Sequence, residues 1–410
     1  MRWALIVVIF LLVEIYAFQA FKTLFKFNWI SKIYVFINLS LISILVYRLF
    51  SIYSKSLSFS DLFYDYLSIP IAFLITLFGF KLITCSFLIF EDIIRSLRWL
   101  INFLFNLSEP NEFTFQRRQF VSKIALLIAS IPIPFVIYGI FKGRFNYRVI
   151  NYELEFVDLP DAFDGYQLTQ ISDIHCGSLK GINEIEYAVE LINKQKSDVV
   201  LFTGDFVNSK SKELIKWKDV FSKIEASEGK YSILGNHDYG DYVSWPSKLE
   251  KKKNFDLLLK IQKEMGFKLL LNENIKITRN KQSINIIGVE NWGKGGFKKN
   301  GDIDKACLGL KNEDFKIVMT HDPSHWEQKL INHQTQFHLT LSGHTHGMQF
   351  GIEIPGWIKW SPIKWAYKYW AGLYQEKNQY LNVNRGFGVL AFPGRVGIWP
   401  EISVIKLKKS

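Results

Sequence analysis

Five short blocks of residues that commonly bind metal ions stand out in this 410-residue chain, and each follows an apolar, strand-like run. With their preceding runs, the blocks are Asp173 and His175 after 168–171, Asp205 after 199–203, Asn236-His237-Asp238 after 231–234, His321 after 315–320, and His344 and His346 after 337–341. Short apolar runs bounded by glycine or polar residues predict strands. Because ligands in open α/β sheets bind just past the carboxyl ends of strands, we expect the five blocks to meet at one site.

The distribution of histidines indicates a metal site. Five of the eight histidines in the chain lie in these blocks, whereas a lone histidine is more often a packing or surface residue. Imidazoles and carboxylates suit divalent transition metals, and two such ions can hold both the attacking and the leaving oxygen of a displacement at phosphorus. The three cysteines, Cys85, Cys176 and Cys307, give no disulfide framework, and Cys176 is interpreted as an incidental neighbour of His175.

In this order, the blocks Asp-x-His, Gly-Asp, Gly-Asn-His-Asp, His and Gly-His-x-His resemble the calcineurin-like metallophosphoesterase superfamily, in its membrane-anchored bacterial form with N-terminal transmembrane helices. The resemblance covers residues 150–410. It implies two packed β-sheets flanked by helices, and a site for two divalent ions such as Mn, Fe or Zn. The ligands that it implies are Asp173, His175 and His346 for the first ion, Asn236, His321 and His344 for the second, and Asp205 as the bridge between them.

Four further residues are candidates for catalysis or substrate binding. By resemblance, His237 is not a ligand, and we expect it to stabilise charge on the phosphoryl group and to protonate the leaving oxygen. Asp238 either orients that imidazole or is an ordinary turn carboxylate. Arg385, beside Asn384, either binds a substrate phosphate through two N–H groups or forms a salt bridge.

The C-terminal part of the chain alternates between strand and helix patterns, which predicts an α/β domain. We place this domain at 152–410, after a linker at 143–151. Besides the runs before the blocks, the predicted elements are strands at 150–156, 284–289 and 402–407, and helices at 183–195, 213–226 and 247–265.

The first 142 residues have a different character. They contain four apolar stretches near the length of about 20 residues that crosses a bilayer, at 3–21, 33–50, 67–90 and 120–141. The first stretch lacks a small-residue cleavage site and three more follow, so it is predicted to be a span rather than a signal peptide. The predicted fold is therefore an α-helical membrane bundle followed by the α/β domain.

Two charged residues, Glu14 and Lys81, lie deep within the first and third predicted spans. Charges are costly there, so the residues either form an ion pair that orders the bundle, or Lys81 extends to the interface while Glu14 is protonated. After the third span, residues 92–107 repeat a charge or an amide among large apolar residues. This pattern predicts a helix lying in the membrane interface.

The sidedness of the chain is predicted from its loops. Basic residues follow the first span (Lys22, Lys26 and Lys32) and the third (Arg95, Arg98, Arg117 and Arg118), whereas the second loop carries chiefly Arg48 and Lys55. The positive-inside rule therefore places the first and third loops in the cytoplasm and the catalytic domain outside it. The Arg117-Arg118 pair before span four also resembles a twin-arginine export signal.

Residues 357–370 interleave Trp, Tyr and Lys, a composition that suits a membrane interface. Because this stretch closely follows the Gly-His-Thr-His block, we expect it near the metal site. It is either a lipid-facing lip that admits a membrane-borne phosphate ester, or a packed loop of the domain core.

Together these features predict a membrane-anchored, dinuclear metal phosphohydrolase that cleaves a phosphate ester or pyrophosphate, lipid-linked or near the membrane. One alternative is a UDP-diacylglucosamine-type pyrophosphohydrolase on the cytoplasmic face, and another is a non-catalytic receptor or scaffold built on a phosphoesterase fold. A net charge of +12 fits anionic lipid surfaces. We expect no nucleic-acid partner, because no recognised binding module is present. The expected partners are the bilayer and a phosphorylated substrate, and the oligomeric state is left open.

Overall fold

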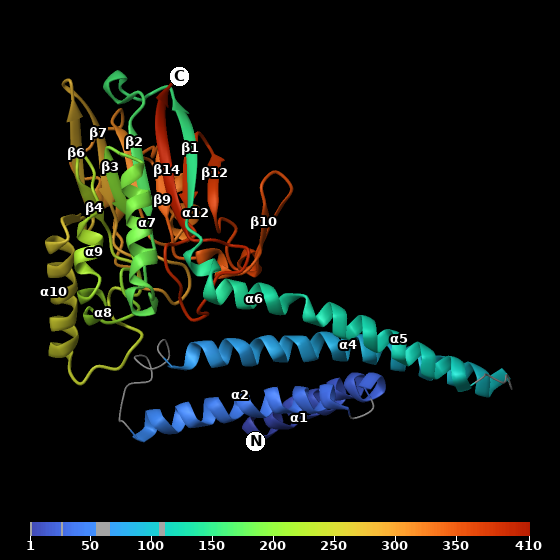
Figure 1. The fold of residues 1–410 in the computed structure, drawn as a ribbon. Helices are drawn as coiled ribbons and strands as arrows, with labels where there is room; N and C mark the ends of the chain where they lie inside the picture. The colour runs from blue at the N-terminus through green and yellow to red at the C-terminus, as the bar shows by residue number, and fades with distance from the viewer. Residues whose placement is uncertain (1, 26–27, 55–65, 106–110) are drawn as a thin grey trace. The chain divides into compact units, whose positions relative to one another are not determined.

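The computed structural model describes residues 2–25, 28–54, 66–105 and 111–410. It divides into two compact units, Met1–Tyr138 and Gly139–Ser410. The first unit is helical and the second contains all the described strands (Figure 1). Lys26, Lys55 and the end of the predicted interface helix at 106–107 lie outside the described residues.

In the described part of the chain, five α-helices precede the first strand: α1 (Arg2–Phe25), α2 (Trp29–Ser54), α4 (Ser68–Phe105), α5 (Asn111–Ser130) and α6 (Pro132–Phe141). Four segments of the described chain are long and apolar enough to cross a membrane, which confirms the predicted number of spans: Val8–Phe25, Trp29–Ser51, Ser68–Phe105 and Gln116–Phe141. The last predicted span is divided at Ile131, because Pro132 cannot continue the helical hydrogen bonding of α5.

The predicted interface helix at 92–107 is helical up to Phe105, but it is not divided from the third span. Helix α4 continues through this region to Phe105 in a single run of 38 residues. The amphipathic pattern was identified correctly as helical, but no glycine or proline between 91 and 105 ends the preceding helix.

The ion pair predicted between Glu14 and Lys81 is confirmed. The Lys81 ammonium contacts the Glu14 carboxylate, and its side chain is only 3% exposed. Helix α2 completes this cluster, because Asn38 Oδ1 lies 2.5 Å from Lys81 Nζ and the Tyr34 hydroxyl donates to Glu14 over 2.8 Å. A single cluster of polar side chains therefore connects α1, α2 and α4.

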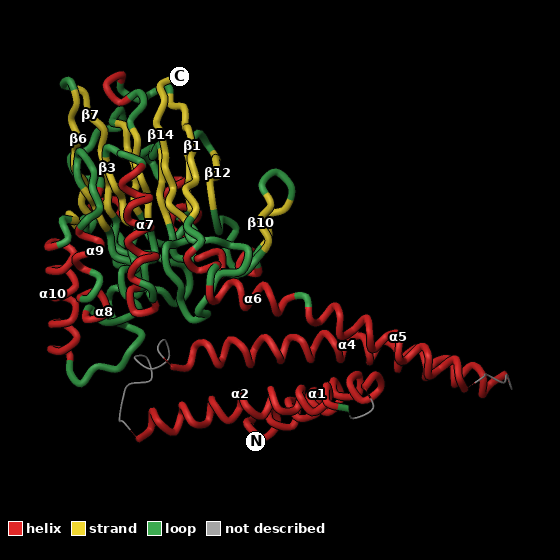
Figure 2. The backbone as a smooth tube through the Cα atoms, in the orientation of Figure 1, coloured by secondary structure: helices red, strands yellow, loops and turns green. Residues whose placement is uncertain are grey.

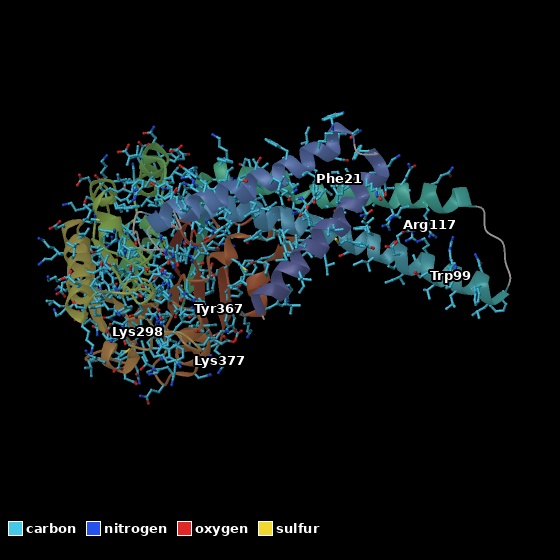
Figure 3. All side chains as sticks on the ribbon, turned by 90° about the horizontal axis from the view of Figure 1, so that it is seen from below. Phe21, Trp99, Arg117, Lys298, Tyr367 and Lys377 are labelled. Carbon is cyan, nitrogen blue, oxygen red and sulfur yellow. The ribbon has the colours of Figure 1, made fainter. Side chains whose placement is uncertain are left out.

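The two adjacent arginines also have partners within the helical unit. Arg117 and Arg118 of α5 both bind the buried Glu91 carboxylate of α4, at 3.0 and 2.6 Å. Arg118 also contacts Asp92 at 2.8 Å. Figure 3 shows the Arg117 side chain on α5 and that of Trp99 on α4. The arginine pair therefore has a packing role that joins these two helices.

Two six-stranded sheets and a hairpin make up the strands of the second unit (Figure 2). The first sheet contains, in spatial order, β1 (Arg148–Phe156), β14 (Glu401–Lys409), β2 (Gln167–Ile171), β3 (Val199–Phe202), β4 (Lys230–Ser232) and β5 (Phe267–Leu269). The second contains β12 (Gly372–Glu376), β13 (Gln379–Val383), β9 (Leu339–Ser342), β8 (Phe315–Met319), β7 (Gln282–Gly288) and β6 (Glu273–Arg279). The hairpin pairs β10 (Ile352–Ile354) with β11 (Ile358–Trp360).

Helices cover the outer faces of both sheets. Those in the unit are α7 (Ile182–Lys194), α8 (Lys212–Ile215), α9 (Lys218–Ser222), α10 (Lys248–Glu264), α11 (Ile303–Ala306) and α12 (Ser324–Gln328). Short 3₁₀ turns are η2 (Gly143–Phe145), η3 (Asp161–Phe163), η4 (Cys176–Ser178), η5 (Leu330–Asn332), η6 (His346–Gln349) and η7 (Pro362–Trp365). The predicted helices at 183–195 and 247–265 correspond to α7 and α10, whereas 213–226 contains two short helices instead of one.

The side chains of the strands explain the layers. In β3, Val199 and Leu201 enter the core between the sheets, while Val200 and Phe202 pack under the helices. Parallel strands buried on both faces tend to be apolar throughout, as the sequence VVLF of β3 is. The predicted pair of packed β-sheets flanked by helices is confirmed.

Strand direction determines which end of the first sheet carries the predicted ligands. Strands β2, β3 and β4 are parallel to one another, whereas β14 is antiparallel to β2 and parallel to β1. The carboxyl ends of β2 to β4 therefore lie at the same end of the sheet as the start of β1. Strand β1 begins at Arg148, so part of the 143–151 segment predicted to be a linker is strand.

Candidate metal centre

The predicted ligands follow five strands of two sheets and approach one another. Asp173 and His175 follow β2, Asp205 follows β3 and Asn236 follows β4, all in the first sheet. His321 follows β8, and His344 and His346 follow β9, in the second sheet. The expected convergence of the blocks is thus present in the fold.

One group of possible metal ligands comprises Asp173, His175 and His346, whose ligand atoms lie within 4.8 Å of one another. Both ring nitrogens of His175 and Nε2 of His346 are buried without a hydrogen-bond partner. Leaving buried polar atoms unpaired is costly. These imidazoles are therefore suited to donating a lone pair to a bound cation. The residues therefore fit a divalent cation.

A second group comprises Asp173, Asp205 and His321. Oδ2 of Asp205 lies 3.2 Å from Nε2 of His321 and 3.6 Å from Nε2 of His175, so this carboxylate stands between the two groups. The Nδ1 atom of His321 lies 2.7 Å from the Thr203 carbonyl oxygen and donates to it. That hydrogen bond leaves Nε2 as the nitrogen that can bind a metal, as is usual for metal-binding histidines.

Asn236 and His344 extend the second group. Nδ1 of His344 lies 2.9 Å from Oδ1 of Asn236 and 3.3 Å from Nε2 of His321. On the other side of the ring, Nε2 of His344 lies 2.9 Å from the Tyr367 hydroxyl, which in turn donates to Asp322 over 3.2 Å. The imidazole of His344 is thereby held with Nδ1 directed at its two neighbours.

The backbone at these positions is strained. Asp173, His175, Asp205, His344 and His346 all have a positive φ, between 49° and 72°. Residues other than glycine rarely adopt this conformation, and such residues cluster at functional sites where surrounding contacts hold them. Two glycines make room for the turns, because a Cβ at Gly235 would clash with Asp205 and one at Gly343 would clash with Ser172 and Asp173.

The electrostatics of the cluster favour added positive charge. Burial lowers the pKa of His321, but the Asp205 and Asp173 carboxylates outweigh it and raise the pKa to about 10. Burial holds the pKa of His175 well below its ordinary value, so this imidazole is neutral and available as a ligand. Carboxylates and imidazoles are donors that a divalent cation takes, and its charge would replace the proton that the two carboxylates favour on His321.

His237 lies beside the cluster and is oriented by the backbone. Its Nδ1 atom lies 2.6 Å from the Asn208 carbonyl oxygen and donates to it, and its ring centroid is 4.9 Å from that of His175. Tyr242 packs on the other side, with ring centroids 4.4 Å apart, and its hydroxyl accepts from Asn236 over 2.8 Å. The half-buried His237 therefore has Nε2 available for a substrate oxygen.

Of the two roles considered for Asp238, the structure supports the turn carboxylate and not the orientation of His237. The Asp238 carboxylate accepts from the backbone N–H groups of Asp205 and Gly235 at 2.8 and 2.9 Å, and from Phe206 at 2.9 Å. Its side chain therefore fixes the turn that carries Asp205, and Asn208 orients His237 in its place. Burial and the nearby Asp205 charge raise the pKa of Asp238 to about 7.

The substrate role considered for Arg385 and Asn384 is also wrong. Arg385 is buried, its Nε and Nη2 atoms donate to Glu353 at 2.9 and 2.5 Å, and Nη1 pairs with Glu401. Asn384 is buried, donates to Ser403 over 2.8 Å and accepts from the backbone of Gly386 at 2.8 Å. The alternative of a salt bridge was correct, although this one is buried rather than at the surface.

Sequence reasoning missed two residues next to the predicted ligands. The buried Arg395 donates to the carbonyl oxygens of Gly386 and Gly388, and its Nη2 atom is 3.3 Å from Nδ1 of His346. Nothing in its local sequence marks it. Tyr367, which contacts His344, belongs to the aromatic stretch 357–370 and is labelled in Figure 3. Its contact confirms that this stretch reaches the candidate site.

Comparison with known proteins agrees with the fold. Residues 166–348 match the family model described as "Calcineurin-like phosphoesterase". Residues 1–144 match the model described as "Probable Calcineurin-like phosphoesterase, transmembrane domain". The two matched regions correspond to the domain that carries the predicted ligands and to the helices that precede it.

Several curated proteins are similar to this chain. A transmembrane protein with metallophosphoesterase domain from Danio rerio is 27% identical over 70% of this chain, which spans 62% of that protein's length. The uncharacterised metallophosphoesterase YkuE of Bacillus subtilis is 28% identical over 62% of this chain and 82% of its own. An uncharacterised metallophosphoesterase of Campylobacter jejuni is 24% identical over 98% of this chain and 97% of its own.

Proposed function

Since this chain belongs to the calcineurin-like metallophosphoesterases, which are metal-dependent hydrolases, we propose that it binds two divalent ions and cleaves a phosphate ester or pyrophosphate at the membrane. The position of Asp205 is the observation that carries this proposal, because its carboxylate lies within 3.6 Å of a histidine on each side. In the proposal, Asp173, His175 and His346 hold one ion, Asn236, His321 and His344 hold the other, and Asp205 bridges them.

Bound ions of this kind supply an activated water and neutralise charge on the phosphoryl group. The residues of the chain supply the rest. His237, held by Asn208, donates a proton from Nε2 to the leaving oxygen. Tyr367 and Asp322 keep His344 in the orientation that presents Nδ1, and Arg395 contacts His346. All three are positioning residues that act through the ligands.

The chain itself supports a substrate at or near the membrane. Helix α6, the end of the fourth candidate span, stops at Phe141, and β1 begins at Arg148. The carboxyl ends of β2 to β4, which carry the predicted ligands, lie at the same end of the sheet as Arg148. A phosphate ester carried by lipid is therefore the substrate class that we propose.

The proposal is tested by hydrolysis of bis(4-nitrophenyl) phosphate and 4-nitrophenyl phosphate by the full-length protein. We expect nitrophenolate release that is abolished by a chelator and restored by Mn²⁺. The ratio between the two substrates separates diester from monoester preference. A protein that binds metal but cleaves neither of these phosphate esters would support the receptor or scaffold alternative, against which the complete set of predicted ligands argues.

The side of the membrane on which the domain lies separates the remaining candidates. The basic loops after the first and third spans support a domain outside the cytoplasm. A topology reporter fused after Ser410 tests this placement. A cytoplasmic reporter signal would favour the alternative of a UDP-diacylglucosamine-type pyrophosphohydrolase, because that substrate is available on the cytoplasmic face.

A further inference from the structure

The β10–β11 hairpin and its flanking turns carry a concentration of exposed apolar side chains. Trp357 and Trp365 are 76% and 77% exposed, the highest values for tryptophan in the described chain. Four other exposed apolar residues precede them along the same segment: Met348, Phe350, Ile352 and Ile354. We call residues 348–365 the hairpin surface, and in Figure 1 the β10 hairpin stands out from the body of the domain.

The two faces of the hairpin differ in character. Ile352 pairs with Trp360 and Ile354 pairs with Ile358, so these four side chains lie on one face. Glu353 and Lys359 form the pair on the opposite face. Alternation along each strand thus gives the hairpin one apolar and one charged face.

The charged face is attached to the domain. Glu353 accepts two hydrogen bonds from the buried Arg385, at 2.9 and 2.5 Å, and the Lys359 ammonium binds the Ala371 carbonyl oxygen. Because the ion pair and this hydrogen bond hold one side, the hairpin has a defined orientation. On its apolar face Ile352 and Ile354 are exposed, and Ile358 and Trp360 are half-buried. Arg385 thereby attaches the hairpin to the domain.

The root of the hairpin adjoins the end of the last candidate span. The Gly351 N–H donates to the Val396 carbonyl oxygen over 2.9 Å. The Val396 N–H in turn donates to the Gln349 carbonyl oxygen over 2.8 Å. The neighbouring Arg395 N–H donates to the carbonyl oxygen of Gly139 over 3.1 Å. Gly139 lies in α6, two residues before the candidate span ends at Phe141. All of these residues belong to the second unit.

The hairpin surface also adjoins the candidate metal centre at both of its ends. It begins two residues after His346, within the same 3₁₀ turn. It ends two residues before Tyr367, whose hydroxyl lies 2.9 Å from Nε2 of His344. A molecule bound along this surface would therefore be close to the predicted ligands.

We propose that the hairpin surface docks into the headgroup and acyl-chain boundary of the membrane that anchors this chain, where it delivers a lipid-borne phosphate ester to the metal centre. Exposed tryptophans beside the exposed Lys364 are typical of that boundary, and a lysine there attracts anionic headgroups. The hairpin surface is attached next to the end of a candidate span, which favours the bilayer over a protein as its partner. The delivery step rests on the proposed phosphohydrolase function, whereas the docking step does not.

Fluorescence quenching tests the docking. Full-length protein carrying Cys307→Ser and Trp357→Cys is labelled with an environment-sensitive dye and reconstituted into vesicles of phosphatidylcholine and phosphatidylglycerol. The matched control is Val157→Cys, because Val157 is 74% exposed and follows the far end of β1. The nine-residue β1 separates it from the start of the strand by roughly 26 Å. Nitroxide-labelled acyl chains are expected to quench the dye at 357 several-fold more strongly than at 157.

Equal quenching at the two positions would overturn docking. A dye at 357 that is shielded from aqueous iodide but untouched by the nitroxide lipids would also overturn it, since this pattern indicates contact with a second copy of the chain.

Hydrolysis tests the delivery step. Trp357→Ser/Trp365→Ser is expected to cleave a long-chain alkyl 4-nitrophenyl phosphate in vesicles several-fold more slowly than wild type, with unchanged cleavage of soluble bis(4-nitrophenyl) phosphate. Equal losses on both substrates would overturn delivery. A wild-type protein that cleaves neither substrate would contradict the proposed function, while the quenching result would still decide docking.

Discussion

Nε2 of His321 lies 3.2 Å from Oδ2 of Asp205, and this contact joins the two sheets of the domain. Asp205 follows β3 in the first sheet, and His321 follows β8 in the second. Neither sheet carries a complete set of predicted ligands. The candidate metal centre therefore exists only when the sheets are packed together, and metal binding should stabilise that packing.

Replacement of His237 should separate chemistry from metal binding. His237→Ala is expected to retain both metals and near-normal substrate affinity, with turnover reduced by about 10²–10⁴-fold, the usual effect of losing a positioned acid. The loss should be smaller for a nitrophenyl phosphate than for an alkyl phosphate, because nitrophenolate leaves without a proton.

The control for His237 is its neighbour Asn236. Asn236→Ala should weaken binding of one metal and recover part of its activity with excess ion. A His237→Ala protein that loses metal, or that is impaired equally on good and poor leaving groups, would exclude His237 as the general acid.

Replacement of Asp238 should act on the turn rather than on the leaving group. Asp238→Asn leaves buried backbone N–H groups without a good acceptor, at a cost of roughly 1–3 kcal/mol each. We expect a lower melting temperature and weaker metal binding, with the dependence on leaving group unchanged. The control is Asp256→Asn, an exposed carboxylate on α10. Leaving-group effects like those of His237→Ala would restore the orienting role to Asp238.

Removal of Arg385 should destabilise the domain without raising the KM for a soluble substrate. Arg385→Met leaves Glu353 and Glu401 without their cation, and breaking a buried pair typically costs roughly 3–5 kcal/mol. Arg279 also binds two carboxylates, but its side chain is 30% exposed compared with 5% for Arg385. Arg279→Met should therefore cost less in thermal unfolding. A raised KM with little change in stability would support direct binding of substrate by Arg385.

The ion pair in the helical unit makes a separate prediction. Glu14→Gln and Lys81→Met should each lower the thermal stability of the detergent-solubilised protein, because each leaves a charge with no counter-ion in an apolar region. The exchange Glu14→Lys/Lys81→Glu should recover part of that loss in the same measurement. A double variant no more stable than the single ones would indicate that pairing does not order the bundle.

Local features of the sequence predict part of the fold and of the candidate site, whereas contacts between distant segments do not follow from them. The convergence of the blocks was predictable, because ligand type and strand ends are local features and parallel strands bring such ends together. A turn role for Asp238 was one of two alternatives, but the loop that it holds could not be predicted, since these backbone partners lie some 30 residues earlier in the chain. Arg385 likewise depends on Glu353, which a separate hairpin supplies. At 92–105 the amphipathic pattern predicted a helix correctly, but such a pattern contains no information about whether that helix continues the one before it.

Metal content with and without the Asp205 carboxylate tests the central claim most directly. Wild-type protein loaded with Mn²⁺ and desalted should retain about two ions per chain, since two ions share the site. Asp205→Asn should lose metal and abolish hydrolysis, because it removes the one ligand proposed to bind both ions. An Asp205→Asn protein with wild-type metal content and near wild-type hydrolysis would contradict the account.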